Sequence, residues 1–139
     1  MTQQEIDRYF EEKNLVFKDL CGRIPYHVRV QLDDNAYPDP FGAHNLEHFW
    51  GYTIVKPYLF PLSSMSEEQK YDFYCRFIEN DCNFDDLKKF YLDNGMWHKL
   101  LTSLDDIEAI IDWFHKNHID YRGLIPMGLA NDATGKNIY

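Results

Sequence analysis

The residues best suited to chemistry in this 139-residue sequence are His44, Glu47 and His48. On a helix, His44 and His48 lie one turn apart on one face, so both imidazoles can bind a single zinc ion. Glu47 can then activate a water molecule bound to that ion. Such a site needs a third protein ligand, for example Glu79 or Asp112. The pattern predicts a small zinc-dependent hydrolase as one alternative function.

The setting of this pattern favours a structural interpretation. The candidate helix, residues 43–50, has about two turns and is bounded by a glycine on each side. Inverted zinc peptidases use the same His-x-x-Glu-His pattern, but they need a larger scaffold to form a substrate cleft. On the structural interpretation, Leu46 and either Phe49 or Trp50 face the core. We therefore expect no cofactor and no catalytic residue.

Three other polar patterns also have structural explanations. His115 and His118 are spaced for a metal ion, but a helix C-terminus stabilises cations by about 0.3–1 kcal/mol without one. Arg122 could bind a carboxylate or phosphate ligand. We expect instead that it pairs with Asp120 or another nearby carboxylate and holds the chain after the helix. Gly135-Lys136 lacks the first glycine and the final Ser/Thr of a phosphate-binding loop.

The cysteines and the hydropathy pattern predict a cytoplasmic protein. Cys21, Cys75 and Cys82 include no Cys-x-x-Cys pair, which argues against a disulfide framework and a zinc ribbon. We expect free, buried thiols in a reducing compartment. No basic and apolar leader is recognisable, and no stretch approaches the roughly 18 apolar residues of a membrane-spanning helix.

The charge and the aromatic content limit the partners and the domain number. The net charge is −9, and no dense Lys/Arg cluster occurs, so we expect no binding to nucleic acid, which is itself a polyanion. Aromatic residues make up 17% of the chain, enough apolar surface for one proper core. The sequence therefore predicts a single globular domain over residues 1–139.

Aromatic residues crowd the segment between Asp33 and Tyr52. A domain with a radius of about 14 Å has limited room to bury them all, and exposed aromatic side chains mark protein interfaces. We therefore predict a partner-binding surface made of Tyr37, Phe41, Phe49, Trp50 and Tyr52.

In the N-terminal half, the periodicity predicts helix followed by strands. A capping box at Thr2 and Glu5 and apolar residues at helical spacing predict one interrupted helix, or two short ones, over about residues 3–22. Alternating Val28, Val30 and Leu32 predict a half-buried strand over residues 26–33. A loop with two prolines follows to residue 42. A second strand is expected over residues 52–55, stopped by Pro57, and the apolar residues 58–62 are expected to lie extended against the core.

Three helices are predicted in the second half. Ser66 begins the first with a capping box, Asn83 caps the second, and Asn94-Gly95 supplies its stop. Ser103 caps the third, whose apolar face includes Ile110 and Phe114. The fold class is therefore α+β, dominated by helices, with a small antiparallel sheet near the N-terminal half.

Several segments resemble one group of proteins. They are residues 18–26 with the Val28/Val30 strand, residues 55–69 and residues 112–125. These segments resemble uncharacterised small proteins encoded by gut anaerobic bacteria, their phages and their mobile elements. The resemblance covers about half of the chain, and between residues 33 and 51 the sequence departs from it. It implies no activity, only a cytoplasmic accessory role.

These features together predict a non-enzymatic, cytoplasmic interaction protein. It would dock the loop from Asp33 to Tyr52 onto another protein, and the resemblance implies an accessory factor of a phage or mobile element that acts on a host protein. Two alternatives stay open: the zinc-dependent hydrolase around His44 and His48, and a homo-oligomeric structural protein. The sequence does not determine the partner or the oligomeric state.

Overall fold

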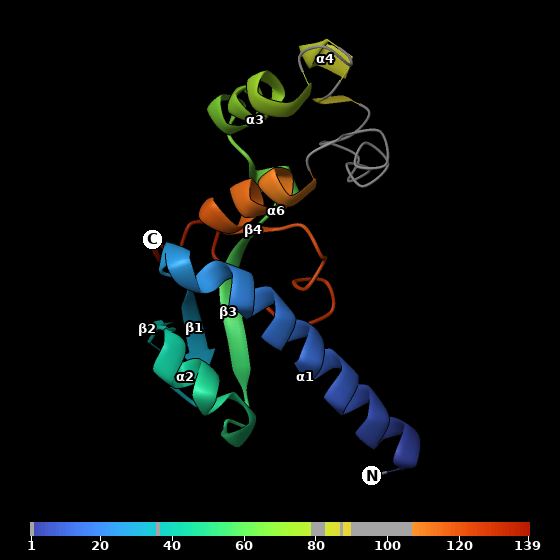
Figure 1. Cartoon of the computed structure of the whole chain (residues 1–139), viewed down its shortest axis with the longest axis vertical. Coiled ribbons are helices and arrows are strands. Elements are labelled where there is room, and N and C mark those ends of the chain that lie inside the picture. The colour runs from blue at the N-terminus through green and yellow to red at the C-terminus, as the bar shows by residue number, and fades with distance from the viewer. Residues whose placement is uncertain (1, 36, 79–82, 87, 90–106) are drawn as a thin grey trace. The chain divides into compact units, whose positions relative to one another are not determined.

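The computed structural model of the chain describes residues 2–35, 37–78, 83–86, 88–89 and 107–139. The chain forms two compact units, unit 1 (Met1–Leu59 and Arg122–Tyr139) and unit 2 (Phe60–Tyr121). The predicted α+β class, dominated by helices, is confirmed (Figure 1). The single domain expected over residues 1–139 stays a prediction. None of the described helices combines the length and the apolar composition needed to cross a lipid bilayer.

Helix α1 (Gln3–Arg23) confirms the helix predicted over residues 3–22. Thr2 and Glu5 form the expected capping box, in which each side chain accepts a hydrogen bond from the other residue's N–H at 3.2 Å. Asn14 does not interrupt the helix, because one such residue costs less than about 0.7 kcal/mol relative to alanine. The helix buries side chains only in its second half, namely Val16, Asp19, Leu20 and Arg23.

The antiparallel part of the sheet lies in unit 1. Strand β1 (Arg29–Leu32) pairs on one side with β2 (Asp39–Pro40) and on the other with β3 (Val55–Pro61). Val30, and Val28 just before the strand, are fully buried, as the alternation predicted. Both pack in one cluster with side chains of α1. The helix and the sheet therefore share one core.

Strand β3 starts later and runs further than predicted. The expectation that Pro57 stops the strand is wrong, because Pro57 lies inside β3 opposite Val30. The fixed φ of proline fits an extended backbone, and proline removes only its own N–H from the hydrogen-bond ladder. The apolar residues 58–62, expected to lie extended, belong mostly to this strand.

Two short strands add parallel pairs that the sequence did not predict. In unit 1, β5 (Asn131–Asp132) pairs with β3, with Asn131 opposite Tyr58. In unit 2, β4 (Ile119–Asp120) pairs with the last residues of β3. Two residues are too few to show the period of two by which a strand is recognised in a sequence.

The first helix of unit 2 begins where the sequence predicted. In α3 (Glu67–Phe73), the Ser66 hydroxyl accepts from the Gln69 N–H at 3.1 Å, and the Gln69 side chain accepts from the Ser66 N–H at 3.0 Å. This capping box satisfies two N–H groups that a helix start leaves without partners. The helix continues as a π-helical turn, Tyr74–Ile78.

The other two predicted helices of unit 2 are described in part. Helix α4 (Phe84–Asp86) begins after Asn83, whose side-chain oxygen accepts from the Asp86 N–H at 2.8 Å, so this cap is confirmed. Helix α6 (Ile107–Lys116) buries Ile110 and Phe114 of the predicted apolar face. The predicted stop at Asn94-Gly95 and the cap at Ser103 lie outside the described residues.

Each unit has its own apolar core. The largest cluster of unit 1 consists of Val16, Leu20, Val28, Val30, Phe41, Phe49 and Val55. The cluster of unit 2 consists of Met65, Phe73, Ile78, Ile110, Trp113, Phe114 and Ile119.

A buried ion pair holds the second half of α1. Asp19 and Arg23 are both fully buried, and Arg23 Nε lies 2.7 Å from a carboxylate oxygen of Asp19. The other Asp19 oxygen accepts from Arg122 Nε at 3.1 Å. Arg122 therefore holds the chain after β4 to α1, a partner that is 103 positions away in sequence.

Candidate functional site

The loop between Asp33 and Tyr52 is held at its two ends. The Asp33 carboxylate accepts from the backbone N–H groups of Thr53 and Ile54 at 2.7 and 2.9 Å, and the Asp33 N–H donates to the Ile54 carbonyl at 2.8 Å. Asn35 Nδ2 donates to the Asp39 carboxylate at 2.7 Å. These bonds fix where the loop leaves β1 and where it returns toward β3.

A short helix and a 3-10 turn form the far part of this loop. Helix α2 (Ala43–Glu47) is followed by η2 (Phe49–Gly51). The Asn45 side chain accepts from the Gly42 N–H at 3.0 Å and donates to the Tyr52 hydroxyl at 3.3 Å. Phe49 is fully buried in the core of unit 1. Asn45 and Phe49 therefore fix the backbone that carries the two loop histidines.

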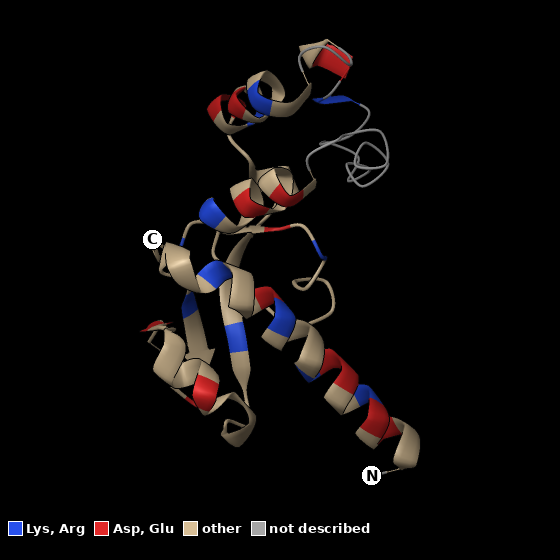
Figure 2. Ribbon diagram, in the orientation of Figure 1, with Lys and Arg blue, Asp and Glu red and all other residues tan. Residues whose placement is uncertain are grey.

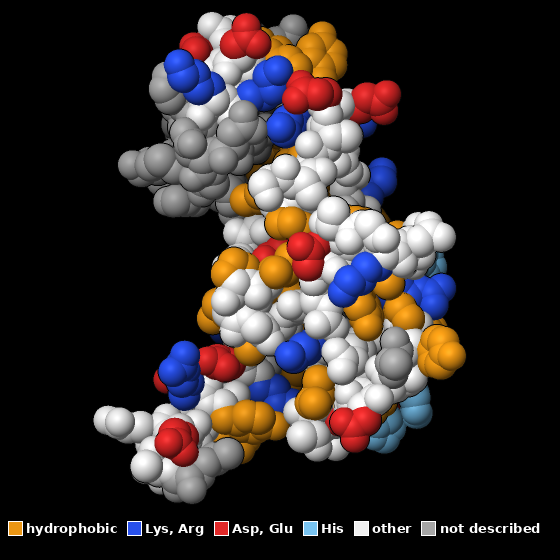
Figure 3. Space-filling model, turned by 180° about the vertical axis from the view of Figure 1, so that it is seen from behind, with side chains coloured by type: hydrophobic (Ala, Val, Ile, Leu, Met, Phe, Trp, Pro, Cys, Tyr) orange, Lys and Arg blue, Asp and Glu red, His pale blue; other side chains and the backbone are white. Residues whose placement is uncertain are grey.

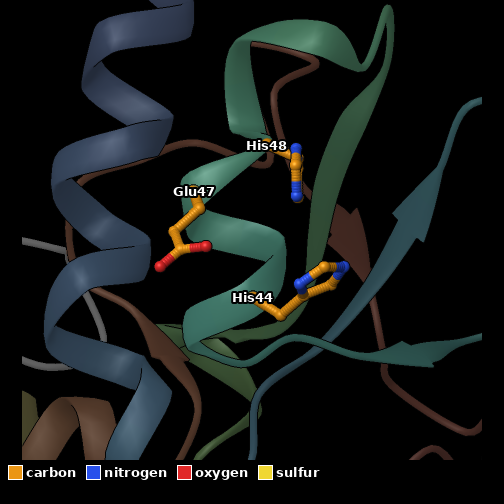
Figure 4. Close-up of side chains that lie close together, drawn as sticks. All are labelled: His44, Glu47 and His48. Atoms are coloured by element: carbon orange, nitrogen blue, oxygen red, sulfur yellow. The ribbon is translucent and has the colours of Figure 1, made fainter.

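The structure brings His44, Glu47 and His48 together on the surface. Their candidate ligand atoms, one from each side chain, all lie within 4.8 Å of one another. The two imidazole rings meet edge to face, with centroids 4.7 Å apart. Figure 4 shows the imidazoles on one side of α2 and the Glu47 carboxylate projecting from the same turn toward α1. The arrangement agrees with the predicted spacing of one helical turn.

The three side chains of this cluster are exposed. Within the described residues, neither the Glu47 carboxylate nor the imidazoles of His44 and His48 make a hydrogen bond or ion pair with another residue. An exposed carboxylate can rotate freely about its side-chain bonds. The cluster can therefore bind a divalent ion without losing an existing contact.

The other predicted ligands lie elsewhere. Glu79 is outside the described residues, and Asp112 is an exposed residue of unit 2. His115 is buried, and its Nε2 lies 2.8 Å from the Tyr121 hydroxyl. The imidazole of His115 is therefore engaged inside unit 2.

The expectation of buried thiols is wrong for two of the three cysteines. Cys21 and Cys75 are free and exposed. Cys21 follows the buried Leu20 on α1, and successive helical positions point about 100° apart. The last cysteine, Cys82, lies outside the described residues.

The predicted partner-binding residues divide into core and surface. Phe41 and Phe49 are 2% and 0% exposed and belong to the core of unit 1. Tyr52 is half-buried against the same core. Trp50 is 49% exposed and Tyr37 is 78% exposed. The loop therefore contributes Trp50 and Tyr37 to the surface, while the two phenylalanines hold it in place.

Trp50 is part of a larger aromatic surface that includes α1. Its ring lies 6.4 Å from that of Phe10 between centroids, and the Phe10 ring lies 5.4 Å from that of Tyr9. Phe10 is 52% exposed, and Tyr9 is also exposed. Figure 1 shows the N-terminal part of α1 running beyond the sheet of unit 1. We call Tyr9, Phe10, Lys13 and Trp50 the α1–η2 surface.

Lys13 lies at the centre of this surface. Its Nζ lies 5.6 Å from the Tyr9 ring centroid and 5.5 Å from the centroids of Phe49 and Trp50. The same ammonium group donates to the carbonyls of Trp50 and Tyr52 at 3.4 and 2.5 Å. Cation–π contacts at such distances contribute about 0.5–1 kcal/mol each at exposed sites. Lys13 therefore holds η2 against α1.

A small hollow opens next to this surface. Its volume is about 120 Å³, the share of roughly four water molecules in the liquid. It is lined by Tyr9, Glu12, Lys13, Val16, Thr53, Ile54, Val55, Lys56 and Leu129. On the face shown in Figure 3, hydrophobic side chains lie at the surface between charged side chains. The hollow is large enough for one side chain of a partner.

Sequence reasoning missed the contribution of α1 to this surface. Tyr9 and Phe10 belong to the apolar residues whose helical spacing predicted this helix, and no exposed surface was predicted for them. Both rings are exposed because α1 buries side chains only in its second half, from Val16 onward. No local pattern marks this exposure, because it depends on tertiary packing beneath α1.

A second hollow lies in unit 2. Its volume is about 470 Å³, and its charged groups include Asp72 and Arg76, which form an ion pair at 2.9 Å. The Asp72 carboxylate also accepts from Trp113 Nε1 at 2.8 Å. This hydrogen bond, with a smaller contribution from Arg76, lowers the pKa of Asp72 below its ordinary value. The lining includes none of the predicted site residues that come from the loop, which all lie in unit 1.

The geometry therefore offers two candidates, the α1–η2 surface and the His44/Glu47/His48 cluster. No family model, curated protein or solved structure matches this chain.

Proposed function

We propose that the chain is a non-enzymatic protein-interaction module that docks onto another protein through the α1–η2 surface. The observation that carries this proposal is the exposure of two touching rings, Phe10 at 52% and Trp50 at 49%. They come from segments forty positions apart, and Lys13 holds the second segment in place.

The exposed rings supply the kind of contact that dominates protein binding. Tryptophan and other aromatic anchors carry much of the affinity of an interface. Covering the exposed halves of Phe10 and Trp50 would remove roughly 200 Å² of apolar surface from water, a gain of about 5 kcal/mol before the cost of association. The indole N–H of Trp50 makes no hydrogen bond to any described residue, so a partner can accept it.

The surface favours an apolar partner segment flanked by basic residues. The hollow beside Tyr9 accepts one apolar side chain. Residues 3–14 contain four acidic residues and two basic ones, and Figure 2 shows acidic positions along this part of α1. Arg8 and Lys13 already have partners within unit 1. Acidic groups around an apolar contact steer association with a basic surface.

Two further features support a role as an accessory factor in the cytoplasm. Exposed free thiols at Cys21 and Cys75 fit a reducing compartment. The resemblance to small proteins of gut bacteria, phages and mobile elements fits an accessory protein that acts on a host protein.

Tyr37, with 78% of its surface exposed, offers a second contact from the loop.

The proposal is tested by comparing variants in affinity capture from the native host. Wild-type chain, Trp50→Ala and Phe10→Ala are immobilised, and bound proteins are identified by mass spectrometry. A protein captured by wild type is then purified and titrated by calorimetry. Both substitutions should weaken its binding at least about 30-fold, which corresponds to about 2 kcal/mol.

Tyr71→Ala is the matched control, because Tyr71 is an aromatic residue of unit 2 that is 54% exposed. It should bind like the wild type. Equal binding by Trp50→Ala and wild type would overturn the proposal. Light scattering separates the homo-oligomeric alternative: a dimer that Trp50→Ala dissociates would mean that a second copy covers the surface instead of another protein.

A further inference from the structure

The geometry points to a surface site for a divalent transition-metal ion of the zinc class, held by His44, Glu47 and His48. It goes beyond the docking proposal and does not depend on it, because no residue of the α1–η2 surface is a ligand. The inference concerns binding of the ion, not hydrolysis.

The spacing of the ligand atoms is within reach of one ion. Zinc binds imidazole nitrogen and carboxylate oxygen at about 2.0–2.2 Å, so tetrahedral ligands lie roughly 3.3 Å from each other. The candidate atoms already lie within 4.8 Å. Rotation of exposed side chains about their own bonds covers the remaining difference, without movement of the backbone.

The backbone that carries the ligands is fixed on both sides. Asn45 closes the start of α2 through its bond to the Gly42 N–H at 3.0 Å. Phe49, directly after His48, is fully buried. Because the backbone is already ordered, metal binding costs only the conformational entropy of the three side chains.

The donor set selects the class of ion. Two imidazoles and one carboxylate suit Zn²⁺, Co²⁺, Ni²⁺ or Cu²⁺, whereas Mg²⁺ and Ca²⁺ prefer oxygen ligands alone. Three protein ligands leave one position for water or for a donor from another molecule. Binding also requires unprotonated imidazoles, so affinity should fall as the pH is lowered.

The position of Glu47 distinguishes binding from catalysis. Its carboxylate lies within reach of both imidazoles, so it is placed to be the third ligand. A carboxylate that binds the ion is not available as the base that activates a water molecule. The site thus takes its three protein ligands from one turn, without Glu79 or Asp112.

The test is titration of the full-length chain with ZnCl₂, with the exposed thiols of Cys21 and Cys75 alkylated beforehand. Calorimetry gives stoichiometry and affinity, and NMR of the imidazole nitrogens identifies which rings bind the ion. The variants are His44→Ala, His48→Ala and Glu47→Gln. Their side chains are exposed, so the variants should keep the wild-type circular dichroism spectrum. His27→Asn is the control, because His27 is exposed and asparagine tolerates its left-handed backbone, with φ of 60°.

One ion should bind, with shifts at the rings of His44 and His48. Loss of either imidazole should weaken binding at least about 100-fold, since even residues that only orient a ligand change metal affinity about 10- to 100-fold. Glu47→Gln should weaken binding about tenfold, and His27→Asn should leave it unchanged. The proposal is overturned if zinc does not bind in a ratio of one, or if His44→Ala and His48→Ala bind as tightly as the wild type.

Discussion

The two units use aromatic residues in opposite ways. In unit 2, Phe73, Trp113 and Phe114 contact one another with ring centroids 5.3–5.6 Å apart, and all three are buried. In unit 1, Phe10 and Trp50 make a similar ring contact while about half of each residue stays exposed. Similar ring contacts thus form a core in one unit and a surface in the other.

Trp113 and Trp50 show how a core ring differs from a surface ring. Trp113 is 7% exposed, and its indole N–H donates to Asp72 at 2.8 Å. The indole N–H of Trp50 makes no hydrogen bond within the described part of the chain. A buried indole needs an internal acceptor, whereas an exposed one can use water or a partner. The polar group of the ring, as well as its exposure, therefore indicates its role.

The largest expected difference is in stability between a core ring and a surface ring. Phe114→Ala should lower the free energy of unfolding by about 3–5 kcal/mol, because it leaves a cavity in the core of unit 2. Trp50→Ala should lower it by less than about 1 kcal/mol, because the ring is half exposed. Urea unfolding followed by circular dichroism measures both values. Equal losses would break the contrast between the two units.

A second contrast lies within α1, between its buried and exposed halves. Asp19→Asn should cost about 3–5 kcal/mol, because it leaves the buried charge of Arg23 without its carboxylate. Glu12→Gln removes an ion pair with Arg8, whose side chain is 81% exposed, and should cost no more than about 0.5 kcal/mol. Thermal unfolding of both variants makes the comparison. A large loss for Glu12→Gln would mean that the first half of α1 contributes to the fold.

The hydrogen bond between Trp113 and Asp72 should appear in the pH dependence of stability. The pKa of Asp72 is lowered in the folded state, first by this bond. The ionised Asp72 carboxylate therefore stabilises the folded state above the pKa of the unfolded state, about 3.8. This stabilisation is lost as the pH falls through the lower pKa of the folded state. Trp113→Phe should differ less from wild type at pH about 2 than at pH about 7, as measured by urea unfolding. A constant difference would show that Asp72 is not involved.

The smallest expected effect concerns Tyr139. Its hydroxyl donates to the Tyr58 carbonyl at 2.6 Å and accepts from the Arg29 N–H at 3.0 Å. Burial of the hydroxyl raises the pKa of Tyr139 from 10.0 to about 12, although 42% of the residue as a whole is exposed. The stabilisation is therefore full below pH 10.0 and is lost as the pH rises through about 12. Absorbance titration of wild type minus Tyr139→Phe should give this late transition, and a midpoint near 10.0 would contradict it.

Local sequence signals predicted the helices and strands better than they predicted how these elements pair and which side chains stay exposed. The capping boxes at Thr2 and Ser66 and the alternation at Val28 and Val30 depend on neighbouring residues, so they could be read from the sequence. The pairing of β5 with β3 depends on residues about seventy positions apart, so no local pattern shows it.

In the candidate site, too, the feature set by local sequence was predicted and the feature set by distant contacts was not. The spacing of His44 and His48 predicted their cluster because one helical turn brings them together. The exposure of Phe10 depends on where the sheet ends beneath α1, which no local pattern contains.

The most direct test of the account is hydroxyl-radical footprinting of the free chain, read by mass spectrometry. Trp50 should be oxidised readily, and Trp113 should be protected, because 49% of one residue and 7% of the other are exposed. The purified partner should then protect Trp50 and leave the oxidation of Tyr71 unchanged. Protection of Trp50 in the free chain equal to that of Trp113 would contradict the account.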